Sequence, residues 1–216
     1  MKRVSLFCGH YGSGKTNIAV NYALYIKSLG FDVSIADLDI VNPYFRTKDS
    51  EEELRKAGVE LISLPFANSS VDLPALPAEA YGLVQRRDRY AVFDIGGDDR
   101  GAYALGRYTP YIIEENDFDM FFVANFYRPL TRTPEEAFGV MQEIQSACAI
   151  PFTGIINNSN IGEMTTGEDI EKTVPLVNRL SELSGLPVAF TCADERIKDV
   201  TNCENLFHLR LQKKYF

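Results

Sequence analysis

The stretch Gly9-His10-Tyr11-Gly12-Ser13-Gly14-Lys15-Thr16 follows an apolar run at 4–8 and precedes a helical pattern at 15–28. It fits G-x-x-x-x-G-K-[ST], the pattern of a phosphate-binding loop between a strand and a helix. Glycines let such a loop curl until successive N–H groups point at one anion, and the dipole of the helix adds positive potential there. The stretch therefore predicts binding of a nucleoside triphosphate.

The side chains of this loop have separate expected roles. Lys15 reaches the outer phosphates and is predicted to be catalytic, and the Thr16 hydroxyl is predicted to ligate a magnesium ion. The residues of the loop that are predicted to contact the nucleotide are Gly9, Gly12, Ser13, Gly14, Lys15 and Thr16.

Length and composition limit the classes of protein. The chain has 216 residues, enough for one α/β domain, and its net charge of −8 argues against broad nonspecific binding to nucleic acid. The four cysteines have no C-x-x-C spacing, which indicates reduced thiols rather than disulfides or a zinc site. No window is long and apolar enough for a transmembrane helix, and the N-terminal apolar run is too short for a signal peptide. We expect a cytoplasmic protein that binds neither nucleic acid nor a membrane.

Strand and helix patterns alternate along the chain. Predicted strands lie at 4–8, 33–36, 59–64, 90–95, 120–124, 152–156 and 188–191. Predicted helices lie at 15–28, 50–56, 78–86, 133–147, 170–183 and 204–211, with a tyrosine-rich one within 103–111. Strands that are apolar throughout and separated by helices indicate a mostly parallel sheet covered by helices on both faces. We expect residues 1–216 to form a single P-loop nucleotide-binding domain of the α/β class.

Acidic residues end two of the predicted strands, at the edge of the sheet where parallel α/β proteins bind ligands. A triphosphate needs a metal ion to offset its charge, so a carboxylate near the loop is expected. Asp94 precedes two glycines and suits a metal-facing acid, with a capping role in the turn as the alternative. Asp37 and Asp39 lie two residues apart. One of them would hold the metal through water and the other would orient the attacking water, unless either is a plain cap or turn residue.

Together these residues resemble the MinD/ParA class of P-loop ATPases, which includes CobQ, CobB and the nitrogenase iron protein. The resemblance rests on the phosphate loop, on Asp37-Leu38-Asp39-Ile40 and on Asp94-Ile95-Gly96-Gly97. It implies that Asp39 lies in switch I and positions the hydrolytic water, which makes Asp39 catalytic, and that Asp94 begins switch II. It also implies that Thr16, Asp39 and Asp94 hold Mg²⁺.

Recognition of the base also follows from the resemblance. Members of the class place an Asn after a late strand, where it contacts adenine, and Asn157 in Ile155-Ile156-Asn157-Asn158 is the implied contact. The alternative is that Asn157 is a turn residue at the end of a strand. The turn Cys192-Ala193-Asp194 follows the last strand and implies a second contact from Asp194. Guanine-specific proteins carry Asn-Lys-x-Asp, whereas 157–160 reads Asn-Asn-Ser-Asn, so ATP with Mg²⁺ is expected.

The chain departs from the class at the second position of the loop. The class carries a lysine there, which reaches across a homodimer to the nucleotide of the partner, and this chain has His10. An imidazole is a poorer partner for phosphate than an ammonium. A homodimer is one expected assembly, and His10 argues against the form that sandwiches the nucleotide. Arg46 or Arg100 would supply the missing charge, unless each is a surface arginine.

Three functional hypotheses follow. The first is a Mg-ATP-dependent switch with slow hydrolysis, whose turns at Asp39 and Asp94 alter a surface for an unidentified protein partner. The second is an ATP-dependent small-molecule kinase or ligase similar to dethiobiotin synthetase, with 42–48 and 65–77 around the acceptor. The third is a nucleotide-binding regulator without hydrolysis, for which His10 is the clue.

Overall fold

The computed structural model describes residues 1–38, 50–63, 78–96, 105–203 and 205–211. Its eight strands form one sheet in which every neighbouring pair is parallel. The strands are β1 (Val4–Cys8), β2 (Val33–Leu38), β3 (Glu60–Ser63), β4 (Tyr90–Ile95), β5 (Phe118–Ala124), β6 (Gly154–Asn157), β7 (Val188–Asp194) and β8 (Leu206–Leu209). Their order is β3-β2-β4-β1-β5-β6-β7-β8, which places β1 and the phosphate loop near the middle.

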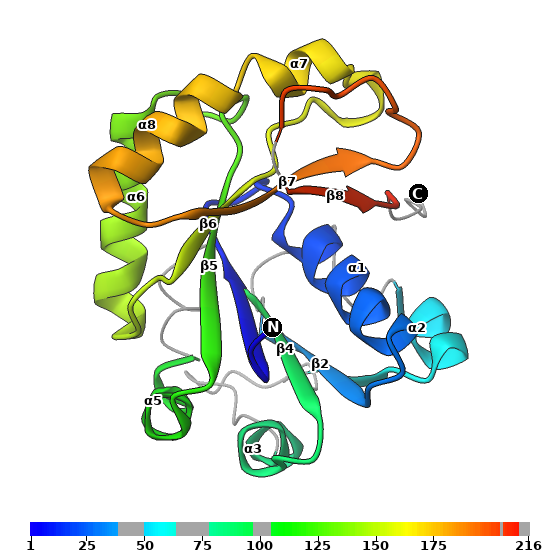
Figure 1. Cartoon of the computed structure of the whole chain (residues 1–216). Coiled ribbons are helices and arrows are strands. Elements are labelled where there is room, and N and C mark those ends of the chain that lie inside the picture. The colour runs from blue at the N-terminus through cyan, green and yellow to red at the C-terminus, as the bar shows by residue number, and fades with distance from the viewer. Residues whose placement is uncertain (39–49, 64–77, 97–104, 204, 212–216) are drawn as a thin grey trace, which may run out of the picture.

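Helices cover both faces of this sheet (Figure 1). They are α1 (Lys15–Ser28), α2 (Glu51–Ala57), α3 (Ala78–Gln85), α5 (Thr109–Glu115), α6 (Pro134–Cys148), α7 (Gly167–Glu171) and α8 (Val174–Ser184). α1 and α2 pack on one face, and α3, α5, α6 and α8 pack on the other. The predicted α/β fold, a parallel sheet between two helical layers, is confirmed. Within the described ranges no helix has the length and hydropathy needed to cross a bilayer.

The strand β1 shows why the central strands have no polar face. Val4, Leu6 and Cys8 are fully buried in the core on the α6 side, and Phe7 is fully buried in the core on the α1 side. Successive side chains of a strand point to opposite faces, so a strand covered on both faces must be apolar at most positions. This is why the sequence shows short apolar runs at these strands instead of an alternation of apolar and polar residues.

The last element of the chain corrects one prediction. The predicted helix at 204–211 is wrong, because residues 206–209 form the strand β8, which pairs in parallel with β7. The ring of Phe207 contacts the rings of Tyr22 and Phe190. Pairing with β7 satisfies backbone groups that would otherwise lie open at the edge of the sheet, and a segment this short is a poor helix by itself.

The region predicted as a single helix at 170–183 contains two helices. α7 ends at Glu171, and α8 begins at Val174 with Pro175 in its first turn. Proline suits this position because its missing N–H would have no partner in the helix there. The proline explains why a new helix begins here. The spacing of the apolar residues alone does not reveal this break.

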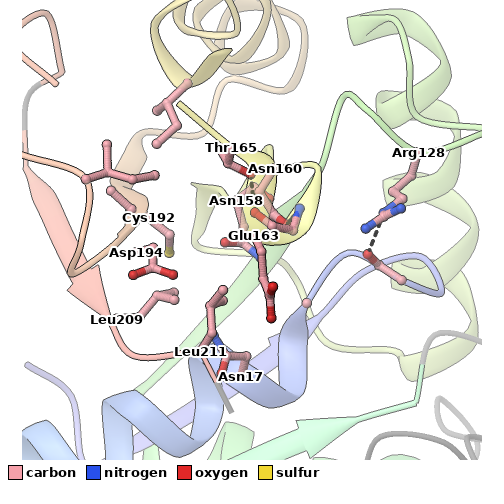
Figure 2. Close-up of a pocket in the computed structure, with 16 residues that line it drawn as sticks. Asn17, Arg128, Asn158, Asn160, Glu163, Thr165, Cys192, Asp194, Leu209 and Leu211 are labelled. Carbon is pink, nitrogen blue, oxygen red and sulfur yellow. Dashed lines mark hydrogen bonds between the residues drawn. The ribbon is translucent and has the colours of Figure 1, made fainter. Parts of the chain in front are cut away.

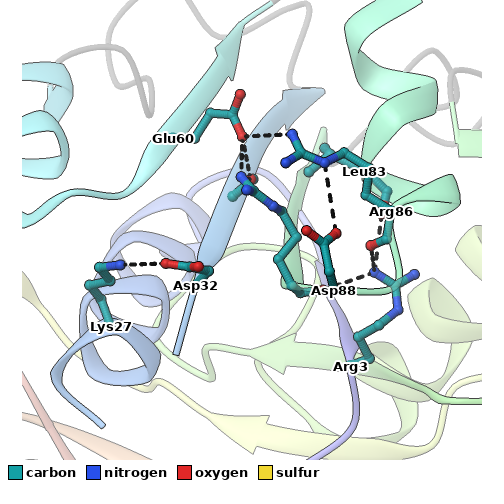
Figure 3. Close-up of polar contacts among 9 residues, drawn as sticks. Arg3, Lys27, Asp32, Glu60, Leu83, Arg86 and Asp88 are labelled. Atoms are coloured by element: carbon teal, nitrogen blue, oxygen red, sulfur yellow. Dashed lines mark hydrogen bonds and ion pairs between the residues drawn. The ribbon is translucent and has the colours of Figure 1, made fainter. Parts of the chain in front are cut away.

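The amino edge of the sheet is tied together by one buried arginine (Figure 3). Arg3 Nη1 donates to the carbonyl oxygens of Leu83, Arg86 and Arg89 at 3.1, 3.2 and 3.1 Å. The guanidinium also forms an ion pair with Glu115, and the two side chains are only 9% and 8% exposed. This network joins β1 to the end of α3, the segment before β4 and the end of α5.

Candidate functional site

A cavity of about 200 Å³ opens at the carboxyl edge of the sheet, beside the phosphate loop (Figure 2). One wall is formed by the loop and α1, and the other by the turns after β6 and β7 and the end of the described chain. Its lining includes Gly12, Gly14, Asn17, Arg128, Asn158, Asn160, Glu163, Thr165, Ile170, Cys192, Asp194, Ile197, Leu209 and Leu211. Segments far apart in the sequence therefore meet at the edge where ligands of such sheets bind.

Two glycines of the loop are required by the space around them. A Cβ atom at Gly9 would lie 2.5 Å from the carbonyl oxygen of Val123, and one at Gly14 would lie 2.3 Å from Asn158 Nδ2. Gly14 also has a φ of 90°, which L side chains rarely adopt, and α1 begins at the next residue. The loop is therefore tightly enclosed by β5 and by the turn after β6.

The polar side chains of the loop are buried. Ser13, Lys15 and Thr16 are 2%, 4% and 6% exposed. Lys15 Nζ donates a long hydrogen bond of 3.4 Å to the carbonyl oxygen of His10. Ser13 Oγ has no hydrogen-bond partner among the residues that the structure describes. Buried polar groups with so few partners fit a loop that takes up an anion, and the residues present thus fit the phosphates of a nucleotide.

Two carboxylates lie side by side at the same edge. Asp37 on β2 is paired in register with Asp94 on β4, and Asp94 is also paired with Phe7 on β1, two residues before the loop. The two acids are 6% and 0% exposed. In the described ranges no group of three or more His, Cys, Asp or Glu side chains could hold a metal ion. Thr16 and Asp94 nonetheless offer the hard oxygen ligands that Mg²⁺ prefers.

Several predicted residues lie outside the residues that the structure describes. They are the acid Asp39 and the arginines Arg46 and Arg100. The two segments predicted to surround a small-molecule acceptor, 42–48 and 65–77, also lie outside.

The structure brings Asn158 to the cavity and leaves Asn157 behind it. Asn157 is fully buried, its Nδ2 donates to Thr173 Oγ1 at 2.9 Å, and its Oδ1 accepts from the hydroxyl of Ser159 at 2.7 Å. Asn158 and Asn160 line the cavity. Their place in the lining, and not a free amide, distinguishes these two residues from Asn157, because Asn160 Nδ2 donates to the Asn158 carbonyl at 2.7 Å and Asn160 Oδ1 accepts from the Gly162 N–H at 3.1 Å. The contact of Asn157 with a base stays a prediction.

Two side chains hold the outside of the phosphate loop. Asn158 Nδ2 donates to the carbonyl oxygen of Ser13 at 2.7 Å, and Arg128 Nε donates to that of Gly12 at 3.0 Å. The sequence implied Asn157 as the base contact and gave neither Asn158 nor Arg128 a role at the loop. The signal for Asn158 was its place at the end of a strand, whereas Arg128 lies in a turn with no motif.

The far end of the cavity combines apolar walls with one engaged carboxylate. Ile170, Ile197 and Leu209 supply apolar surface there, together with Cys192, whose thiol pKa is raised far above its ordinary value by burial. Asp194 is 8% exposed and accepts hydrogen bonds from the Arg196 guanidinium at 3.0 and 2.7 Å. These bonds lower the pKa of Asp194 below its ordinary value. An apolar slot with polar groups at one end suits a flat heterocycle.

No protein-family model and no curated protein matches the sequence. Among solved structures, the chain is similar to the cell division protein FtsY of Thermotoga maritima, with 19% identity and a TM-score of 0.59. That match covers 90% of this chain and 63% of the other. The signal recognition particle receptor FtsY of Elizabethkingia anophelis, in complex with GDP, matches with 18% identity and a TM-score of 0.59 over 95% and 60% of the two chains.

The 54 kDa signal recognition particle protein of Aeropyrum pernix, in complex with GDP, matches with 17% identity and a TM-score of 0.56. That match covers 88% of this chain and 41% of the other. The chain thus spans less than two thirds of the length of these proteins. The structural similarity, together with the loop, shows the P-loop NTPase fold. It does not show that the chain is of the MinD/ParA type.

Proposed function

We propose that this chain is a Mg-ATP-binding P-loop ATPase that acts as a nucleotide-dependent switch of the MinD/ParA type. The observation that carries the proposal is the enclosed loop, in which Gly14 leaves no room for a side chain beside Asn158, and Lys15 and Ser13 are buried. In this proposal the loop amides and Lys15 hold the phosphates, and Thr16 helps to hold Mg²⁺. The metal would offset the charge of the phosphates.

Adenine is the base that we propose. Guanine presents two N–H donors on one edge, and a free carboxylate is the usual partner for both. Asp194 already accepts from the backbone N–H of Arg196 at 2.9 Å as well as from its guanidinium. Asn158 Nδ2 is bonded to the Ser13 carbonyl, and both ends of the Asn160 amide are bonded, to the Asn158 carbonyl and the Gly162 N–H. We propose that Asn158 Oδ1, for which no partner is seen among the described residues, accepts from the amino group of adenine. Glu163 is the other carboxylate of the described lining, and it is exposed.

The switch would act at the ends of β2 and β4, where Asp37 and Asp94 lie side by side. We propose that a bound triphosphate orders the turns after these strands and that Asp39 positions the attacking water. Hydrolysis then releases the turns and changes the surface that an unidentified protein partner contacts.

Titration calorimetry with Mg-ATP and Mg-GTP tests the binding, and release of inorganic phosphate tests the turnover. We expect tighter binding of ATP than of GTP, loss of binding in Lys15→Ala, and binding without turnover in Asp39→Ala. Lys27→Ala, at the other end of α1, is the matched control. Turnover that is unchanged in both loop and switch variants contradicts the ATPase proposal, and transfer of labelled γ-phosphate to a metabolite favours a kinase instead.

A further inference from the structure

The side chain of Arg128 lies against the phosphate loop (Figure 2). Its Nε donates to the carbonyl oxygen of Gly12 at 3.0 Å, and a Cβ atom built at Gly12 would lie 3.7 Å from its Cδ and Nε. The stem of the arginine therefore packs on the backbone of Gly12 while its head bonds the loop. Among the described residues, no partner is seen for the two terminal nitrogens of this guanidinium.

The turn that carries Arg128 is fixed by its own hydrogen bonds. The carbonyl oxygen of the fully buried Asn125 accepts from the Arg128 N–H at 3.1 Å and from Thr131 Oγ1 at 2.8 Å. The Asn125 side chain accepts from the Asn160 N–H at 3.3 Å, which ties the turn to the loop after β6. Arg128 is thus presented to the phosphate loop by a scaffold with little freedom.

The charge of Arg128 is unusual for this cavity. It is the one cationic side chain in the described lining, which also contains the carboxylates of Glu163 and Asp194. His10 stands at the second position of the loop, and its Nδ1 is 3.1 Å from the carbonyl oxygen of its neighbour Tyr11. An arginine beside a polyphosphate keeps its full positive charge at every physiological pH, unlike an imidazole.

We propose that Arg128 is a positioning residue of the phosphate site, which holds the loop in its anion-binding shape and adds a second positive charge from the same chain. The proposal rests on the proposed function of the loop. Arg128 and Asn158 bond the adjacent carbonyls of Gly12 and Ser13. The N–H that follows the Gly12 carbonyl, that of Ser13, donates to the His10 carbonyl oxygen at 3.1 Å, so Arg128 fixes this turn of the loop. In a trans peptide the C=O and N–H point in opposite directions, so the Ser13 carbonyl held by Asn158 directs the N–H of Gly14 the other way. The loop would then need little rearrangement when an anion binds.

Titration calorimetry of three variants, with Mg-ATP and with Mg-GTP in parallel, separates the contribution of the Arg128 hydrogen bond from that of its charge. The variants are Arg128→Ala, Arg128→Gln and Arg128→Lys. We expect Arg128→Ala to weaken binding of the triphosphate about tenfold, Arg128→Lys to recover most of the loss, and Arg128→Gln to recover little. Affinity measured between about 50 and 300 mM salt should fall less steeply in the Ala and Gln variants than in wild type, because one screened attraction is gone. A purely structural role would not change the salt dependence.

Arg132→Ala is the matched control, because Arg132 is an exposed arginine four residues further along the chain. Thermal unfolding of each variant shows whether it is folded, and Arg128→Lys serves if the alanine variant is not. If wild type binds the nucleotide and the Arg128 variants bind it with the same affinity and the same salt dependence, this inference is overturned and the proposed function stands. Wild type that takes up neither nucleotide overturns the proposed function and this inference with it.

Discussion

The two edges of the sheet use charged side chains in opposite ways. At the amino edge Arg3 is surrounded by Glu115 and by four carbonyl oxygens, those of Leu83, Val84, Arg86 and Arg89. At the same edge Arg89 binds Glu60 at 2.7 Å. At the carboxyl edge Lys15 is 4% exposed, and its one hydrogen bond within the described residues is 3.4 Å long. Both edges bury a cation, and only the amino edge supplies its partners.

This difference separates stability from function. A buried cation whose partners are complete fixes the fold, and removing one partner is costly. A buried cation with incomplete partners lowers stability and keeps its bonding capacity for a ligand anion. The same sheet therefore carries a structural edge and a binding edge, and mutations at the two should affect different measurements.

The largest effect is expected at Lys15. Lys15→Ala removes the side chain that reaches the phosphates, and loss of about two charge-assisted hydrogen bonds weakens Mg-ATP binding about a thousandfold. Calorimetry measures the affinity, and urea unfolding measures stability, which should change by less than about 1 kcal/mol. A large loss of stability with little loss of binding would remove the distinction between the edges.

Glu115 gives the opposite result. Glu115→Ala leaves Arg3 buried without its counter-charge and should lower the free energy of unfolding by about 3 kcal/mol in urea. The exposed pair of Arg86 and Asp88, 3.8 Å apart at the same edge, provides the control. Asp88→Ala should cost less than about 0.5 kcal/mol. The affinity of the folded Glu115→Ala protein for Mg-ATP should equal that of wild type.

Gly14→Ala should affect both measurements at once. The new Cβ would lie 2.3 Å from Asn158 Nδ2, and the φ of 90° is strained for alanine. We expect a loss of about 2 kcal/mol in stability and a clear loss of nucleotide affinity, because the Asn158 contact with the loop is displaced. Gly185→Ala has a similar φ of 71° and open space around it, so it should show only the backbone strain of about 1 kcal/mol.

The sequence predicted one half of the site more fully than the other. The phosphate loop is a contiguous segment whose glycines and lysine act through local backbone geometry, so its pattern predicts a cradle directly. The central strands could also be predicted from local sequence, because burial on both faces makes each of them a short apolar run. β8 was mistaken for a helix because its strand structure comes from its partner β7, and pairing at a distance leaves no local period.

The base end of the cavity could be predicted only in part. Its walls come from the turn after β6, the turn after β7 and β8, and their meeting depends on the order of the strands. The resemblance implied the turns after β6 and β7 and, within the first of them, Asn157, whose amide is bonded to Thr173 and Ser159 and which does not line the cavity. Neighbouring residues of a strand face opposite sides, so a shift of one position exchanges an amide behind the cavity for one in its lining, and the sequence does not fix that position.

A smaller effect is expected from Arg196, whose guanidinium engages Asp194 at the base end. Arg196→Ala should free the carboxylate to accept the two N–H groups of guanine and raise the affinity for Mg-GTP relative to Mg-ATP about tenfold. Arg210→Ala is the matched control, because Arg210 bonds the exposed Glu195 at 3.1 Å and does not line the cavity. Calorimetry with both nucleotides decides, and an unchanged ratio shows that Asp194 does not read the base.

The smallest effect is a pH dependence at the same pair. Hydrogen bonds from Arg196 lower the pKa of Asp194, so the folded state favours the ionised carboxylate. The resulting stability is present in full above the ordinary Asp pKa of about 4 and is lost as the pH falls through the lower pKa of the folded state. It should not exceed about 1 kcal/mol, since the Arg196 side chain is 60% exposed. Thermal unfolding of wild type and Asp194→Asn from neutral to acid pH should show a difference that shrinks only at the acid end, and a difference that grows there contradicts the assigned pair.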